Sequence, residues 1–244
     1  MSDANDKPSR YLEPVKQKTA TQDYKLIHAL YRLDIRPKFL LLLMVSHINP
    51  LRPPQEQRGF KTTITAKEWA DSLPGTANPY RDLKAAAEGL VGKRVWISAT
   101  KKWRHWIRGA DYNEGEASIT IYLEDSLLPF LCAPGGLVEF STVNLTHISG
   151  LRHFASLRLY ELLNQFKASG VRQISLDELK GLLSGEDTYP SYANFRRKVL
   201  DKAVRDINDV TNLKVSWIPV KTGRRVTGFK FYIQESNQQS LFDS

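Results

Sequence analysis

One local pattern occurs twice in this chain, and the repetition restricts the possible folds more than any other feature. Residues 60–73 (FKTTITAKEWADSL) and 171–184 (VRQISLDELKGLLS) both read as a short strand that leads into a helix. In each copy a Ser or Thr stands three positions before a Glu, which is the capping box that opens a helix. Glu68 of the first copy corresponds to Glu178 of the second. Two capping boxes at matched positions indicate an internal duplication.

Both copies continue in the same order. A turn rich in Gly and Pro leads to a second amphipathic segment, residues 79–90 in the first copy and 191–207 in the second. Apolar residues then recur at every second position, as in β-strands, over residues 94–123 and 212–233. Strand, helix, turn, helix and hairpin is the order of a winged helix-turn-helix.

One more helical segment precedes each copy, at residues 36–48 and 151–166. The predicted fold is therefore α+β, with two tandem winged helix-turn-helix domains related by internal duplication. The expected organisation is a flexible N-terminal arm (1–20), a first winged-helix domain (21–135), a linker (136–143), a second winged-helix domain (144–234) and a flexible tail (235–244).

The composition indicates in which compartment such a protein works and what kind of molecule it binds. The chain has 35 Lys and Arg against 26 Asp and Glu, and this net charge of +9 favours a polyanionic partner such as nucleic acid. The single Cys132 cannot form a disulfide framework. The N-terminus lacks the apolar core of a signal peptide, and the apolar run of residues 39–45 is too short to cross a bilayer. We therefore expect a cytoplasmic protein without membrane contact.

The second amphipathic segment of the second copy is the candidate DNA-reading helix. In a helix-turn-helix this helix enters the major groove, where Arg pairs with guanine and Asn with adenine. At 100° per residue, an apolar stripe is formed by Tyr192, Phe195, Val199, Leu200, Ala203, Val204 and Ile207. The residues expected to contact DNA are Ser191, Asn194, Arg196, Arg197 and Lys198 at base edges and Lys202 at the backbone. The alternative is a solvated charged face, but the winged-helix order favours DNA reading.

The two hairpins, or wings, add further candidate contacts. In the second copy a glycine turn carries Lys221, Arg224 and Arg225, which suit phosphate or minor-groove contact. In the first copy the auxiliary candidates are Arg81 and Lys84 on the second helix and Lys101, Lys102 and Arg104 on the hairpin. The neighbouring Trp103 and Trp106 are expected in a core or an interface rather than stacked on bases.

The second copy resembles the second winged helix of iteron-binding plasmid replication initiators. Members of that family show an RLYELL-type helix, a capped helix, a Y-x-x-F-+-+-x-V-L helix and a DIN…T…V step, and residues 158–215 contain all of these in order. Residues 25–50 resemble the first helices of the family, although Pro37 stands where an acidic residue is common. The resemblance extends from about Tyr24 to Ile233 and is more specific in the second copy.

This resemblance implies a protein that binds direct repeats (iterons) of double-stranded DNA at a plasmid origin and helps to open an AT-rich segment. In the family, monomers bind the repeats, whereas dimers bind an inverted repeat and repress their own gene. The first winged helix then supplies the dimer contact and auxiliary DNA contacts, and the second is the main DNA reader. The implied partners are a second copy of the chain, the host replication initiator and the replicative helicase, all in the bacterial cytoplasm.

The C-terminal tail suggests one more partner. Its QQSLF segment is similar to the Q-x-x-L-F peptide with which bacterial proteins bind the sliding clamp, and the contacts would be Gln238, Leu241 and Phe242. The alternative is that Leu241 and Phe242 fold back on their own domain or bind nothing, since short motifs often match by chance.

No pattern of an enzyme, a metal site or a cofactor site is apparent in the sequence. The segment GLVGKRV lacks the spacing of a phosphate loop, and His147 and His153 have no third ligand nearby. No pair of histidines accompanies a Tyr nucleophile, as a nicking enzyme requires. Three hypotheses remain: a replication initiator, which we favour; a winged-helix repressor without initiation activity; and a DNA-processing enzyme. Tandem protected repeats in a footprint would indicate initiation, and a lone palindrome would indicate repression.

Overall fold

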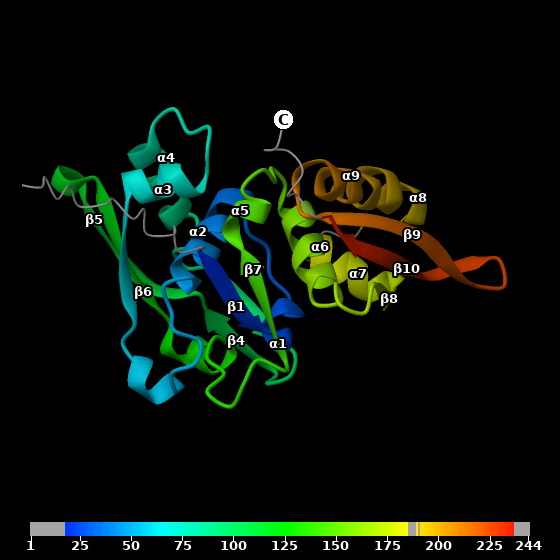
Figure 1. Cartoon of the computed structure of the whole chain (residues 1–244), viewed down its shortest axis with the longest axis horizontal. Coiled ribbons are helices and arrows are strands. Elements are labelled where there is room, and N and C mark those ends of the chain that lie inside the picture. Colours follow the sequence, from blue (N-terminus) through cyan, green and yellow to red (C-terminus); the bar gives the residue numbers. More distant parts are fainter. Residues whose placement is uncertain (1–17, 185–188, 190, 237–244) are drawn as a thin grey trace, which may run out of the picture.

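Both halves of the chain contain a three-stranded antiparallel sheet of the same topology (Figure 1). In this computed structural model, which describes residues 18–184, 189 and 191–236, the strand before each helix pair bonds to the last strand of the hairpin that follows. The predicted α+β fold with a duplicated winged-helix order is confirmed. The strands are β2 (Lys61–Thr65), β6 (Ser118–Leu123) and β5 (Ile107–Asn113) in the first half, and β8 (Val171–Ser175), β10 (Arg225–Glu235) and β9 (Leu213–Thr222) in the second.

The two helix pairs begin at the predicted hydroxyl caps. Thr65 Oγ1 accepts a hydrogen bond from the Glu68 amide at 3.1 Å, and Ser175 Oγ accepts one from the Glu178 amide at 3.2 Å. Both carboxylates bind a histidine: Glu68 lies 2.8 Å from His47, and Glu178 lies 3.3 Å from His28. The pairs consist of α3 (Ala66–Ser72) and α4 (Pro79–Glu88), and of α7 (Leu176–Ser184) and a composite helix made of α8 (Tyr192–Phe195), a π-helical turn (Arg196–Leu200) and α9 (Asp201–Val210).

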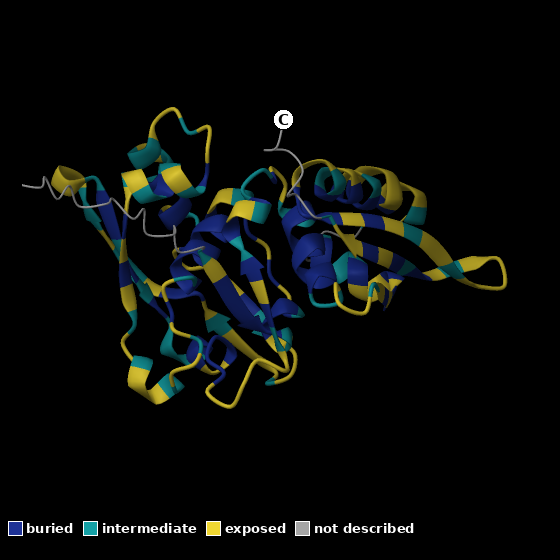
Figure 2. Ribbon diagram, in the orientation of Figure 1, coloured by how far each residue is buried: buried dark blue, intermediate teal, exposed yellow. Residues whose placement is uncertain are grey.

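Two buried helices form the centre of the molecule. Every described residue of α2 (Ile35–Val45) after its first two is buried, and so are most residues of α6 (Phe154–Asn164) (Figure 2). Burial of this much aliphatic surface provides the main driving force for folding. The helix pairs α3–α4 and α8–α9 lie toward the same long edge of the molecule in Figure 1, and the wings β5–β6 and β9–β10 extend toward opposite ends.

The segment between the two halves is partly a strand. Within the expected linker, residues 140–143 belong to β7 (Phe140–Asn144), which pairs with β1 (Thr19–Asp23) in antiparallel register. Ala20 and Val143 are buried in this two-stranded sheet, which explains why the segment is ordered rather than an open linker. Short helices follow each of these strands, α1 (Tyr24–Ile27) after β1 and α5 (Leu145–Ile148) after β7.

The first half contains an additional hairpin that the sequence prediction merged with the wing. Strand β3 (Arg94–Ile97) pairs with β4 (Lys102–His105), and β5 pairs with β6, so residues 94–123 form two hairpins. The expectation that Lys101, Lys102 and Arg104 belong to the first wing was therefore wrong. The tip of the actual wing is a 3₁₀ turn (Glu114–Glu116), and two other 3₁₀ turns lie at Pro54–Gln57 and Asp125–Phe130.

Candidate nucleic-acid interface

The apolar stripe predicted for the composite helix α8–α9 faces the core. Phe195, Leu200 and Ile207 are fully buried, and the ring of Phe195 lies 6.3 Å from that of Phe229 in β10. Tyr192 stacks on the same Phe229 ring at 6.2 Å. The opposite side of the helix is exposed at Ser191, Asn194, Arg197, Lys202 and Arg205, as predicted from the pattern.

The composite helix does not keep an α-helical pitch throughout. Phe195 and Leu200 are both fully buried, although five α-helical steps would place them about 140° apart. The π-helical turn over Arg196–Leu200 widens the helix and brings both side chains to the core. Such turns are often found at functional sites. The turn exposes three consecutive cations, Arg196, Arg197 and Lys198.

The three cations of this turn point in different directions. Arg196 lies on the wing side, with its Nε 3.3 Å from Asp201 Oδ2 and its guanidinium 5.3 Å from the centre of the Trp217 ring in β9. Lys198 lies on the other side, in the wall of a cavity beside the N-terminus of α6. Arg197 stands between these two residues in the turn and is itself exposed, so it lies between the two sides. It therefore occupies the middle of the exposed face.

The second wing presents positive charge without acidic neighbours of its own. Lys221, Arg224 and Arg225 are exposed around the turn between β9 and β10 (Figure 2). Gly223, with φ +60°, adopts the left-handed conformation that this tight turn requires. Among the described residues, none of the three cations forms an ion pair. This arrangement suits contact with a DNA backbone.

The helix pair of the first half carries less free charge. Arg81 is exposed near the start of α4, just after Asn78, whose side chain caps the helix. Lys84, however, forms an ion pair with Glu114 at the tip of the first wing, at 3.0 Å. The hydrogen bond from Lys84 to Glu114 raises the pKa of the lysine. Lys84 therefore stays protonated, and Glu114 compensates part of its positive charge in the free protein.

The cations of the additional hairpin lie outside the winged-helix frame. Lys101 and Lys102 are exposed at the turn between β3 and β4, whereas the Arg104 guanidinium lies 5.9 Å from the Phe130 ring. Trp106 is buried in the core, as expected. Trp103 is half exposed, and the Arg94 guanidinium lies 5.3 Å from the centre of its ring.

A buried charge cluster, which the sequence reading missed, joins the two halves. Lys38 Nζ in α2 lies 2.7 Å from Glu161 Oε1 in α6, and Arg158 Nη1 donates to Glu161 Oε2 at 2.8 Å. Arg158 also donates to the carbonyl oxygens of Ile27 and Ala29 at 2.7 and 3.2 Å. Burial acts to raise the pKa of Glu161, but the charges of Lys38 and Arg158 outweigh it and hold that pKa below its ordinary value. Lys38, which directly precedes the apolar run of residues 39–45, was the available signal.

In the described part of the chain, metal-ligating side chains come together at most in pairs. Within residues 18–184, 189 and 191–236, no three His, Cys, Asp or Glu side chains are grouped so that they could hold a metal ion. Burial raises the pKa of the Cys132 thiol to about 11, so it is protonated at neutral pH. No helix in this part of the chain is both long and apolar enough to span a membrane. Gln238, Leu241 and Phe242, proposed for the clamp, lie outside the described residues.

The sequence and the fold both match known replication proteins. A family model described as "Initiator Replication protein, WH1" matches residues 19–164, and one described as "Initiator Rep protein, WH2" matches residues 175–233. A replication initiation protein of Escherichia coli is 25% identical over 221 residues, which cover 86% of this chain and 68% of that protein. The PI protein of Escherichia coli is 25% identical over 247 residues, with 85% and 79% covered.

A solved structure has the same arrangement of elements. The crystal structure of the Pi initiator protein in complex with iteron DNA matches this chain with a TM-score of 0.78 and 23% sequence identity, over 91% of this chain and 99% of that one. At this identity the similarity concerns the fold, which is two winged helices in tandem. The family models together cover most of the chain and follow its two halves in order. The chain belongs to the family of initiator replication proteins.

Proposed function

We propose that this initiator binds direct repeats of a plasmid origin and reads their bases with the composite helix α8–α9. Arg197 and Asn194 lie on the exposed side of this helix and offer bidentate hydrogen bonds to guanine and adenine. Lys202 and the wing residues Lys221, Arg224 and Arg225 would then contact phosphates on either side of the groove. The Pi initiator, which shares the fold, was crystallised with iteron DNA, and this supports the proposal.

The observation that carries the proposal is the π-helical turn of the composite helix. It exposes three adjacent cations at the N-terminal part of the helix, the part that approaches base edges in a helix-turn-helix. Arg196 is held toward the wing by Asp201 and Trp217, so we assign it to the backbone rather than to a base. Arg197 is then the principal base-reading cation. The first half, with Arg81 and Lys84, would add affinity and little sequence preference.

A footprint on the origin tests this function. When origin DNA is cleaved by hydroxyl radicals in the presence of the protein, tandem repeats should be protected. Within each repeat, the protected positions should lie on one face of the DNA duplex. Permanganate reactivity should also appear in the adjacent AT-rich segment when the repeats are filled. Protection of a single palindrome, without reactive thymines, would instead identify a repressor and contradict the assignment as an initiator.

The remaining partners follow from the family resemblance. We infer a monomer that binds the repeats, in equilibrium with a dimer that binds an inverted repeat and represses the gene of the protein itself. We also infer binding of the host replication initiator and the replicative helicase, all in the bacterial cytoplasm. Binding to the sliding clamp can be tested by a pull-down of the clamp with the full chain and with a Leu241→Ala, Phe242→Ala double variant. Equal recovery of the clamp by both proteins would exclude Gln238, Leu241 and Phe242 as the contact.

A further inference from the structure

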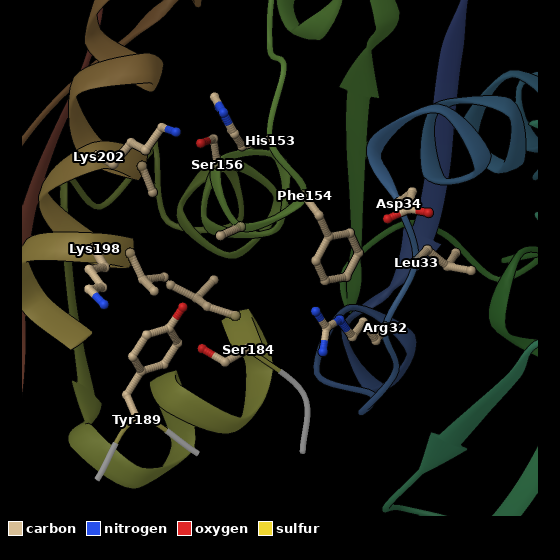
Figure 3. Close-up of a pocket in the computed structure, with 14 residues that line it drawn as sticks. Arg32, Leu33, Asp34, His153, Phe154, Ser156, Ser184, Tyr189, Lys198 and Lys202 are labelled. Atoms are coloured by element: carbon tan, nitrogen blue, oxygen red, sulfur yellow. The ribbon is translucent and has the colours of Figure 1, made fainter. Parts of the chain in front are cut away.

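A cavity of about 240 Å³ lies where the two halves meet (Figure 3). Its walls come from the Arg32–Asp34 segment of the first half, the first turn of α6, the end of α7 and one side of the composite helix α8–α9. Figure 3 shows Lys198 and Arg32 on opposite sides, with Tyr189 and Ser184 between them. The cavity is therefore built by both halves, and it shares Lys198 and Lys202 with the exposed side of the proposed DNA-reading helix.

The charged side chains in the wall of this cavity are mainly cationic. Arg32 comes from the first half, and Lys198 and Lys202 come from the second. Neither lysine forms an ion pair with any residue that the structure describes. Asp34 is the one carboxylate among the described lining residues. Asp206, behind the wall, is already engaged, because its Oδ2 accepts from Ser156 Oγ at 2.6 Å and lies 2.9 Å from His153 Nδ1.

Two further groups in the wall are suited to an anion. The first turn of α6, at Phe154 and Ser156, lines the cavity, and the first hydrogen bond within this helix is donated by the Leu157 amide to the His153 carbonyl. The amides before Leu157 thus lack partners within the helix, and the positive end of the helix dipole lies at the cavity. The Ser184 hydroxyl is buried and has no hydrogen-bond partner among the described residues. A bound acceptor oxygen would satisfy it.

We propose that this cavity is a binding site for a phosphate group, held by Arg32, Lys198 and Lys202 with a hydrogen bond from Ser184. A guanidinium, two ammonium groups, a hydroxyl and a helix N-terminus together match the charge and the several acceptor oxygens of phosphate. Two sources supply this chemistry: a backbone phosphate of the bound duplex, which rests on the proposed function, and a free nucleotide or polyphosphate. With either source, the ligand would connect Arg32 of the first half to the DNA-reading helix of the second.

Titration with inorganic pyrophosphate tests the free source. Calorimetry on the full chain without DNA should show saturable binding that Arg32→Gln and Ser184→Ala each weaken about tenfold. Arg52→Gln is the matched control, because Arg52 is an exposed arginine of the same half outside the cavity wall. The melting temperature of each variant shows whether it is folded, and Ser184→Ala keeps the test valid should Arg32→Gln fail to fold.

The salt dependence of DNA binding tests the duplex source. Arg32→Gln should lower the slope of log K against log salt concentration by about 1 on repeat DNA, whereas Arg52→Gln should leave it unchanged. Ser184→Ala should weaken repeat binding about tenfold at fixed salt. Either set of results supports a phosphate site and identifies its source. If pyrophosphate does not bind and wild type and all variants bind repeat DNA alike, the inference is wrong while the proposed function stands.

Discussion

The two helix-turn-helix units share one frame but expose different charges. In the first unit, Lys84 of α4 bonds to Glu114 at the wing tip, which also carries Glu116. In the second unit, the wing tip is basic and the composite helix exposes three adjacent cations. The buried positions of the two units correspond, whereas the exposed positions have diverged. The core therefore maintains the duplicated fold, and the two units differ in the charge that they expose.

Glu68 and Glu178 occupy matched positions of the two units but have different partners. Glu68 bonds to both Lys18 and His47 at 2.6 and 2.8 Å. Glu178 is more exposed and lies 3.3 Å from His28. In the first unit this position thus bonds to Lys18, the residue before β1, and to His47, whereas in the second unit it reaches His28 of the first half.

The largest loss of stability is expected from a substitution in the buried charge cluster that joins the two halves. Glu161→Gln leaves Lys38 and Arg158 buried without a counter-charge, so the free energy of unfolding should fall by about 3–5 kcal/mol. Urea denaturation followed by circular dichroism measures it. Glu114→Gln, which breaks the exposed pair with Lys84, is the control and should lower the free energy of unfolding far less. Similar small losses for both variants would contradict the buried cluster as a joint between the halves.

The next effect concerns DNA reading itself. Arg197→Ala should weaken binding to the cognate repeat by about 1–3 kcal/mol relative to random DNA, because a bidentate base contact is lost. Fluorescence anisotropy with both DNA sequences measures the difference. Arg81→Ala at the corresponding helix of the first unit should weaken binding to both sequences alike. A larger loss of discrimination from Arg81→Ala would reverse the comparison.

The contributions of Glu68 and Glu178 to the free energy of unfolding should differ. Burial acts to raise the pKa of Glu68, but hydrogen bonds from His47 and Lys18 lower it to about 2. Because the folded pKa is depressed, its stabilisation is complete above about pH 4.5 and is lost as the pH falls toward 2. Glu68→Gln should therefore lower the free energy of unfolding by about 2 kcal/mol at pH 7, with a difference that shrinks below pH 4.5. Glu178→Gln should lower the free energy of unfolding by less than about 1 kcal/mol. Equal losses for the two variants would contradict the expected difference between Glu68 and Glu178.

The smallest effect should come from the wings. Arg225→Ala should lower the salt slope of DNA binding by about 1 and weaken all sequences equally, because a phosphate contact carries no sequence information. Glu116→Ala, at the acidic tip of the first wing, should not lower the slope. An unchanged slope for Arg225→Ala would contradict a contact between the second wing and the DNA backbone.

Much of the fold could be predicted because it depends on local patterns. The hydroxyl caps Thr65 and Ser175 and the apolar stripe of the composite helix follow from spacing alone, and each lies where it was predicted. The positions of exposed cations such as Arg197 follow from the same stripe. Whether they contact DNA stays a prediction.

The features that the sequence reading missed depend on contacts between distant segments. The pairing of β1 with β7 joins residues more than a hundred positions apart. The division of residues 94–123 into two hairpins depends on which strand pairs with β2. The π-helical turn arises because Phe195 and Leu200 must share one core, which a fixed 100° step does not anticipate. The cluster of Lys38, Arg158 and Glu161 requires both halves to be in place.

A crystal structure of the full chain with one direct repeat would be the decisive measurement. We expect α8–α9 to lie in a major groove, with the Arg197 guanidinium within about 3 Å of a base edge and Arg196 still beside Trp217. The first unit should touch that duplex only through phosphates. A complex with α4 in the groove and α8–α9 turned toward solvent would contradict the assignment of DNA reading to the second unit.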